Sequence, residues 1–184
     1  QRLLERHGEC VERGYLALLI SQQQIGEGDW GAAYASASSA AATGEHFAEP
    51  DLVAVALHLQ GRVRILQGRV EEGLEHIRKA FRLNPFPAGW YYLTLGQAQY
   101  AAGDYEAAVE TLRRDETYRT SSRRFLAASL AQLGRLDEAR AEVELFLVAN
   151  PHFTTRHWVA TEPFRDAATL EHFVDGFRKA GLPE

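Results

Sequence analysis

Along most of the chain, hydrophobic residues recur three or four positions apart, and polar residues fill the opposite helical face. β-Branched residues are sparse, and no alternation of apolar and polar positions persists, so strands are not expected. All six prolines lie at the joints between the periodic segments. The pattern predicts an all-α protein with helices over residues 10–26, 30–44, 51–67, 70–83, 88–102, 104–115, 120–133 and 135–149.

One kind of joint recurs along the chain. Gly28, Gly68, Gly103 and Gly134 each close a helical segment, and the residue two places later is apolar and starts the next helix. Glycine at this place tolerates the left-handed conformation in which many helices end. The spacings of 40, 35 and 31 residues bracket a period of about 34 residues. Four joints with the same pattern favour a repeat array over the alternative, a generic antiparallel helical bundle.

The helix pairs resemble tetratricopeptide repeats. The third pair fits that pattern well, with Tyr92, Leu95-Gly96, Gly103 and Ala108 in place. A small residue in each second helix is expected where two helices cross closely. These crossing residues are Ala33, Gly73, Ala108 and Ala139.

The resemblance implies a right-handed α-solenoid of about four helix pairs and a C-terminal capping helix. The pairs cover about 10–44, 51–85, 88–118 and 120–151, within an array over residues 1–151. Residues 1–9 are assigned to a preceding helix. A stacked array leaves its last apolar face open, so residues 152–184 are expected to form a cap, with a last helix that starts at Asp166.

Two stretches are similar to the C-terminal tetratricopeptide region of bacterial class III adenylate/guanylate cyclases. They run from Arg82-Leu83-Asn84-Pro85 to Trp90-Tyr91-Tyr92, and from Phe164-Arg165-Asp166 to Gly176. The first 75 residues look more like the helical repeats of LuxR-type and other multidomain ATPase regulators, for example at Gly68-Arg69-Val70. Both resemblances imply a regulatory or interaction segment of a bacterial signalling protein. They carry over no catalytic residue.

Composition narrows the classes of partner. The net charge is −5 with a pI near 5.8, and both signs are mixed along the chain, so direct binding of nucleic acid or of a membrane surface is not expected. The longest apolar stretch, Tyr15 to Ile20, falls far short of the roughly 18 residues that a membrane span requires. Cys10 is the single cysteine, which fits a reducing, cytoplasmic location.

Catalytic and cofactor motifs are missing from the sequence. No glycine-rich phosphate loop accompanies a strand, so no nucleotide cofactor is expected. His152 and His157 have no cysteine nearby, and His7 with Cys10 supplies only two metal ligands. Paired carboxylates such as Glu71-Glu72 lie in first helical turns, where they stabilise the helix dipole. We therefore predict a noncatalytic protein without a metal or cofactor.

The first helix of each pair lines the concave face of such an array. Aromatic and arginine side chains often dominate binding energy at interfaces, so this face is expected to bind a peptide, a partner helix or a second copy of the chain. The candidate groove residues are Tyr15, Gln22, His58, Arg62, Trp90, Gln97, Tyr100 and Arg124.

Three alternatives remain at this stage. Trp90 either faces the groove or packs inside the array. Arg119, Arg123 and Arg124 either meet an acidic partner or form a solvated face. The chain as a whole either binds a polypeptide or senses a small molecule for an attached output domain. A sensor would hold its ligand in a closed apolar pocket lined by Trp90, Tyr100 and His58.

Overall fold

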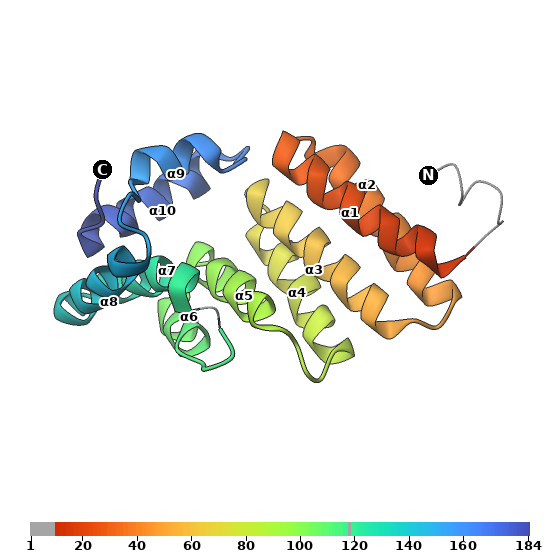
Figure 1. Ribbon diagram of the computed structural model, residues 1–184, viewed down its shortest axis with the longest axis horizontal. Helices are drawn as coiled ribbons and strands as arrows, with labels where there is room; N and C mark the ends of the chain where they lie inside the picture. Colours follow the sequence, from red (N-terminus) through yellow and green to blue (C-terminus); the bar gives the residue numbers. More distant parts are fainter. Residues whose placement is uncertain (1–9, 118) are drawn as a thin grey trace. The chain divides into compact units, whose positions relative to one another are not determined.

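The computed structural model describes residues 10–117 and 119–184 (Figure 1). Every regular element in these ranges is a helix, as the hydrophobic pattern predicts. The expected helix over residues 1–9 lies outside the described residues. The chain divides into two compact units, Gln1–Phe86 and Pro87–Glu184, which are described separately below.

Unit 1 holds two helix pairs: α1 (Val11–Glu27), α2 (Trp30–His46), α3 (Pro50–Leu66) and α4 (Val70–Leu83). Helix α3 packs against α2 and α4 and also contacts α1. The capping residues explain where some of these helices begin. Asp29 Oδ1 accepts a hydrogen bond from the Ala32 N–H at 3.0 Å, and Pro50 takes the first position of α3, where its missing N–H has no cost.

Helices α3 and α4 approach most closely through two glycines. A Cβ atom on Gly61 would lie 2.8 Å from the carbonyl oxygen of Gly73, and one on Gly73 would lie 2.9 Å from that of Gly61. The sequence predicts Gly73 at this crossing but not its partner, Gly61. The other predicted crossing residues, Ala33, Ala108 and Ala139, are fully buried.

The recurring joints are confirmed as left-handed turns. The backbone φ angle is +77° at Gly28, +79° at Gly68, +79° at Gly103 and +74° at Gly134. In this region a side chain would crowd the backbone, so glycine is favoured at all four places. The turns separate α1 from α2, α3 from α4, α5 from α6, and α7 from α8.

Unit 2 holds α5 (Gly89–Ala101), α6 (Tyr105–Leu112), α7 (Arg119–Gln132), α8 (Leu136–Ala149), α9 (Thr155–Thr161) and α10 (Ala167–Ala180). Helix α6 ends three residues before the expected boundary at 115. It gives way to a turn in which Thr117 Oγ1 donates to the Thr111 carbonyl at 3.2 Å. Asp166 caps α10 as predicted, with its Oδ2 atom 2.7 Å from the Thr169 backbone nitrogen.

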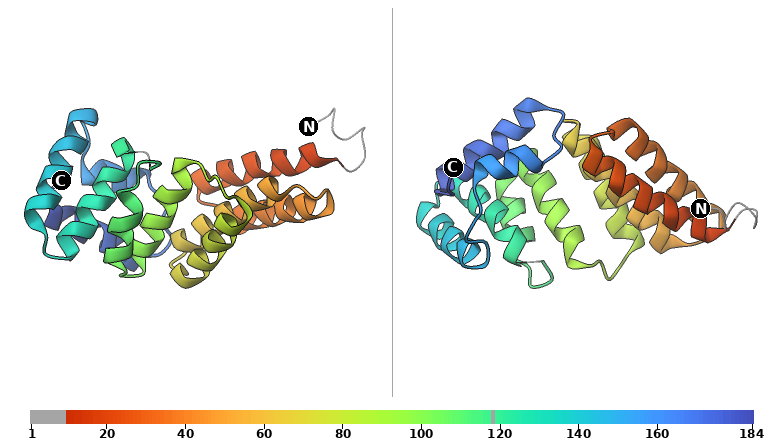
Figure 2. Two further views of the ribbon diagram at one scale, coloured as in Figure 1. Left: turned by 90° about the horizontal axis from the view of Figure 1, so that it is seen from below. Right: turned by 45° about the horizontal axis from the view of Figure 1, so that its top comes forward.

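The last helix is part of the core of unit 2. Helix α10 packs mainly on α7 and also contacts α5, α8 and α9 (Figure 2). Phe173 and Phe177 are fully buried, and the Phe173 ring stacks on Tyr100 with centroids 4.9 Å apart. The division into an array ending at residue 151 and a separate cap remains a prediction.

No helix among the described residues has the length and apolarity needed to cross a bilayer.

Candidate functional site

In unit 1, the predicted groove residues divide into exposed and buried ones. Tyr15 is 44 % exposed, Gln22 is exposed and Arg62 is half-buried. His58 is only 3 % exposed, so its assignment as a contact residue is wrong. Burial, together with the nearby charge of Arg62, lowers the pKa of His58 to about 3. His58 is therefore a neutral core residue beneath the surface that Arg62 reaches.

Two prominent exposed side chains on α1 are not among the predicted groove residues. Leu19 is 70 % exposed and Ile20 is 36 % exposed, although both belong to the apolar stretch from Tyr15 to Ile20. Helical periodicity could have predicted their exposure, because the buried face of α1 is already complete without them. It consists of Gly14, Leu18, Ser21 and Ile25. Leu19 and Ile20 lie off that face.

In unit 2, the predicted groove is occupied by α10. Tyr100 is completely buried, which corrects its assignment as a partner-binding residue. Its hydroxyl donates to the His172 carbonyl at 2.8 Å and accepts from Gln132 Nε2 at 3.2 Å. Burial raises the pKa of Tyr100 well above its usual value, so the hydroxyl stays protonated.

Polar contacts surround the aromatic core under α10. Gln132 on α7 donates to Asp175 Oδ2 at 3.0 Å and accepts from Lys179 Nζ at 2.9 Å. Lys179 also pairs with Asp175 at 2.7 Å, and these hydrogen bonds lower the pKa of the Asp175 carboxyl. Tyr105 and His172 share a hydrogen bond of 2.8 Å. The contacts fix the register of α10 on α5 and α7.

Trp90 and Gln97 on α5 are both half-buried. The Trp90 ring lies against that of the buried Tyr91, with centroids 4.2 Å apart. Since part of each side chain still meets solvent, their role in binding stays a prediction.

Arg123 and Arg124, the two members of the predicted basic cluster whose side chains are described, have separate partners. Arg123 pairs with Glu142 on α8. The Arg124 guanidinium lies 4.6 Å from the ring centroid of Phe125 and also approaches Phe146 and Phe153, so it is largely committed to packing. Burial lowers the pKa of Arg124. The side chain of Arg119 is outside the described residues.

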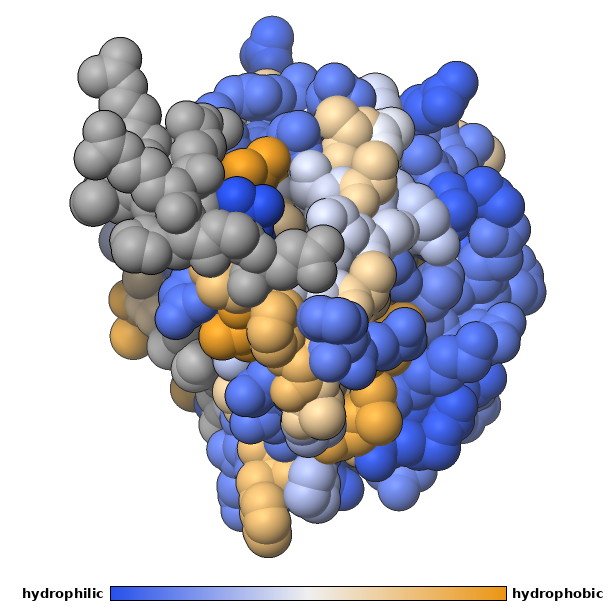
Figure 3. All heavy atoms as spheres, turned by 90° about the vertical axis from the view of Figure 1, so that its right-hand side faces the viewer, coloured by the Kyte–Doolittle hydropathy of each residue, from blue (hydrophilic) through white to orange (hydrophobic). Residues whose placement is uncertain are grey.

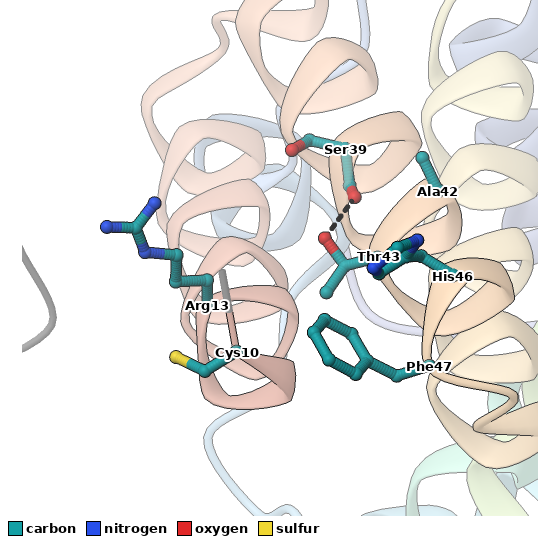
Figure 4. Close-up of a pocket in the computed structure, with 7 residues that line it drawn as sticks. All are labelled: Cys10, Arg13, Ser39, Ala42, Thr43, His46 and Phe47. Atoms are coloured by element: carbon teal, nitrogen blue, oxygen red, sulfur yellow. Dashed lines mark hydrogen bonds between the residues drawn. The ribbon is translucent and has the colours of Figure 1, made fainter. Parts of the chain in front are cut away.

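A pocket of about 410 Å³ opens between the start of α1 and the end of α2 (Figure 4). The Phe47 ring points from α2 toward α1, and Thr43 Oγ1 donates to the Ser39 carbonyl at 2.9 Å. Apolar surface interrupts the hydrophilic surface at this end of unit 1 (Figure 3). The pocket is lined by Cys10, Arg13, Ser39, Ala42, Thr43, His46 and Phe47.

The described residues hold no group of three or more histidine, cysteine, aspartate or glutamate side chains that is placed to bind a metal ion.

Three segments, residues 54–79, 89–114 and 120–144, match the tetratricopeptide repeat family. These three segments are similar to tetratricopeptide repeats. The matched segments cover most of the pairs α3–α4, α5–α6 and α7–α8, which share the turn glycine and the small crossing residue. A search of curated proteins found no match.

Solved structures of other proteins share the fold. The chain is similar to the crystal structure of YrrB, described as a TPR protein with an unusual peptide-binding site, with a TM-score of 0.62 and 17% identity over 98% of this chain and 91% of that one. Two crystal structures of MamA give TM-scores of 0.57 and 0.59, both at 20% identity. They cover 88% and 92% of this chain, and 92% and 90% of their own.

Proposed function

We propose that this chain is a noncatalytic protein-interaction module of a bacterial signalling or regulatory protein, located in the cytoplasm. It binds a partner polypeptide or associates with itself. Tetratricopeptide repeats and the likeness to a peptide-binding protein of the same fold support this function. The observation that carries it is the exposure of Tyr15 and Gln22 on α1, with Arg62 on the neighbouring α3.

Unit 2 indicates what such a face accepts. There the first helices of two successive pairs, α5 and α7, receive a helix that inserts Phe173 and Phe177. Gly176 fits closely over Ala128, because a Cβ on Gly176 would lie 3.0 Å from the Ala128 Cβ. Arg62 precedes its turn glycine by six residues, as Ala128 does. Arg62 is larger than Ala128, so a helix backbone cannot approach α3 as closely as α10 approaches α7. This favours a ligand that contacts α3 through its side chains.

The side chains on this face define the chemistry of the ligand. The guanidinium of Arg62 and the amide of Gln22 suit a carboxylate, since arginine binds carboxylates through paired hydrogen bonds. Tyr15 offers an aromatic ring to an apolar side chain. We therefore propose a peptide in which an acidic residue lies close to an aromatic or aliphatic one.

The sensor alternative loses its supporting residues. Its ligand would have to contact the side chains of Trp90, Tyr100 and His58, but Tyr100 and His58 are both packed in cores.

Fluorescence anisotropy with a labelled library of acidic and neutral peptides tests this proposal. We expect acidic peptides to bind, and Tyr15→Ala and Arg62→Ala each to weaken the best binder by roughly tenfold. Arg82→Ala is the matched control, because Arg82 is exposed on α4 in the same unit. Binding that falls equally in the Arg62 and Arg82 variants, or no binding by any peptide, would contradict the proposal.

A further inference from the structure

We propose that a second copy of this chain docks on the outer face of α1, which comprises Leu16, Leu19, Ile20 and Gln23. The two α1 helices run antiparallel, with Ile20 of each at the two-fold axis. The inference deepens the self-association part of the proposed function. It uses different residues from the peptide site at Tyr15, Gln22 and Arg62.

The internal repeat shows that this face of a first helix normally packs against other helices. When Gly28 is aligned with Gly68, the four face residues correspond to positions 40 residues later in α3. All four counterparts are buried, in a helix that packs on both α1 and α2. They are Ala56, Leu59, Gln60 and Val63.

On α1 the same face is open. Leu19 and Ile20 are 70 % and 36 % exposed, Gln23 is exposed and Leu16 is half-buried. Burying a large apolar side chain such as Leu19 away from water is favourable, so an uncovered face of this kind favours association. Leu59, which occupies the equivalent position in α3, is buried because other helices pack against it.

The charges on α1 favour a second copy as the covering partner. Residues 14–26 include no charged residue, while Arg13 and Glu27 flank them. Ile20 is seven residues from each, and seven residues make nearly two helical turns, so the three side chains lie along one edge of α1. Two antiparallel α1 helices centred on Ile20 bring Arg13 of each copy opposite Glu27 of the other.

This arrangement also accommodates the remaining charges at the ends of the face. Glu12 lies about 100° round the helix from Arg13, on the other edge, and meets the edge of α1 near Gly26 in the second copy, which is not the edge that carries Glu27. A parallel pair would instead set Arg13 against Arg13 and Glu27 against Glu27. The face is therefore complementary to itself in the antiparallel direction only.

Sedimentation velocity of the full 184-residue chain, over a roughly hundredfold range of concentration, measures the association. We expect a monomer–dimer equilibrium that Ile20→Arg weakens by at least about tenfold. Leu145→Arg is the matched control, since Leu145 is an exposed leucine on α8 of unit 2. Circular dichroism checks that each variant keeps its helix content.

Charge exchange tests the antiparallel direction. Arg13→Glu and Glu27→Arg should each weaken the dimer, and the double variant should restore it, because the exchanged charges again face each other. A chain that stays monomeric throughout, a dimer indifferent to Ile20→Arg, or a double variant without rescue would overturn the proposal. So would a chain that dimerises only after residues 1–9 are removed.

The same variants separate this inference from the peptide-binding function. Ile20→Arg should still bind the acidic peptides that Arg62→Ala loses. Loss of the dimer with intact peptide binding, or the reverse, therefore identifies which of the two proposals fails.

Discussion

His58 is a polar side chain in the interior of unit 1. It stands where the first pair has Leu18, ten residues before the turn glycine in both cases, and both residues are buried. The repeat alignment identifies the side of the helix on which His58 lies. Whether that side is buried depends on which other side chains pack against His58, and the repeat pattern does not show this. The sequence therefore led to the wrong prediction that His58 is exposed.

The free energy of unfolding should fall on acidification, partly through His58. An unfolded histidine has a pKa near 6.5, whereas that of folded His58 is about 3. Between these values the unfolded chain binds a proton that the folded chain excludes. The contribution of neutral His58 to the free energy of unfolding is therefore fully present above pH 6.5. It is lost as the pH falls toward 3, by at most about 1.4 kcal/mol per pH unit.

Urea unfolding of the parent chain and His58→Leu, compared at neutral and mildly acidic pH, measures this effect. The leucine variant should lose stability less steeply. His76 and His172 also have lowered pKa values, but they are present in both chains and cancel in the comparison. Identical pH dependence in the two chains would show that His58 is not buried as described.

Gly61→Ala should destabilise the chain by about 1–3 kcal/mol, because the new methyl group would collide with the Gly73 backbone and Ile77. Gly26→Ala is the control: this exposed glycine of α1 has nothing within 4 Å of an added Cβ. There alanine should be neutral or stabilise by up to about 1 kcal/mol. Chemical denaturation of both variants measures the difference, and equal effects would refute the close crossing of α3 and α4.

At the scale of elements, the helices with strong local signals are predictable. Asp29 and Pro50 mark helix starts, and Gly28 marks an end. No glycine or proline occurs between Leu112 and Arg119, where α7 begins, so the early end of α6 has no such signal. The periodicity of α10 predicts its apolar face but not the helices that it covers. The packing of α10 against α5 depends on Gly176, because a side chain at this position would collide with Tyr100.

A double-mutant cycle tests the close contact between Gly176 of α10 and Tyr100 of α5. A Cβ on Gly176 would lie 2.0 Å from the Tyr100 hydroxyl, so Gly176→Ala should cost about 1–3 kcal/mol. Tyr100→Phe removes the colliding oxygen together with its hydrogen bonds. The double variant should therefore lose less stability than the sum of the two single changes.

Fluorescence of Trp158 reports this unfolding, because its buried indole lies 4.8 Å from the Phe177 ring. Trp30 in unit 1 and Trp90 in α5 of unit 2 are present in every variant, so their signals are common to all the unfolding curves that are compared. Strictly additive effects would mean that Gly176 and Tyr100 do not meet.

At the scale of the whole molecule, two units share one chain. The boundary falls in Asn84-Pro85-Phe86-Pro87, where Phe86 is 91 % exposed. Exposed, proline-rich segments with few contacts are typical of boundaries between separately cooperative regions. The period of the repeats runs on through this segment, so the repeat pattern alone does not reveal the division.

Hydrogen exchange should separate the two units. Gly61→Ala is expected to lower amide protection throughout α1–α4 and to leave α5–α10 nearly unchanged, since each unit opens as its own cooperative region. Mass spectrometry of peptides from both units measures this, with Gly176→Ala as the reciprocal variant. A uniform loss of protection along the chain would show a single cooperative unit.

The four turn glycines also have a genetic consequence. A single base change in a glycine codon yields alanine, valine, serine, cysteine, arginine, tryptophan, aspartate or glutamate. Of these, only aspartate enters the left-handed region with any ease, whereas asparagine, which is also well suited, lies two base changes away. Because φ is between +74° and +79° at every one of these glycines, almost every amino-acid change that a single base substitution can cause there is destabilising. Lineages of this chain should therefore drift freely along the exposed helix faces while the codons of these four turns stay nearly fixed.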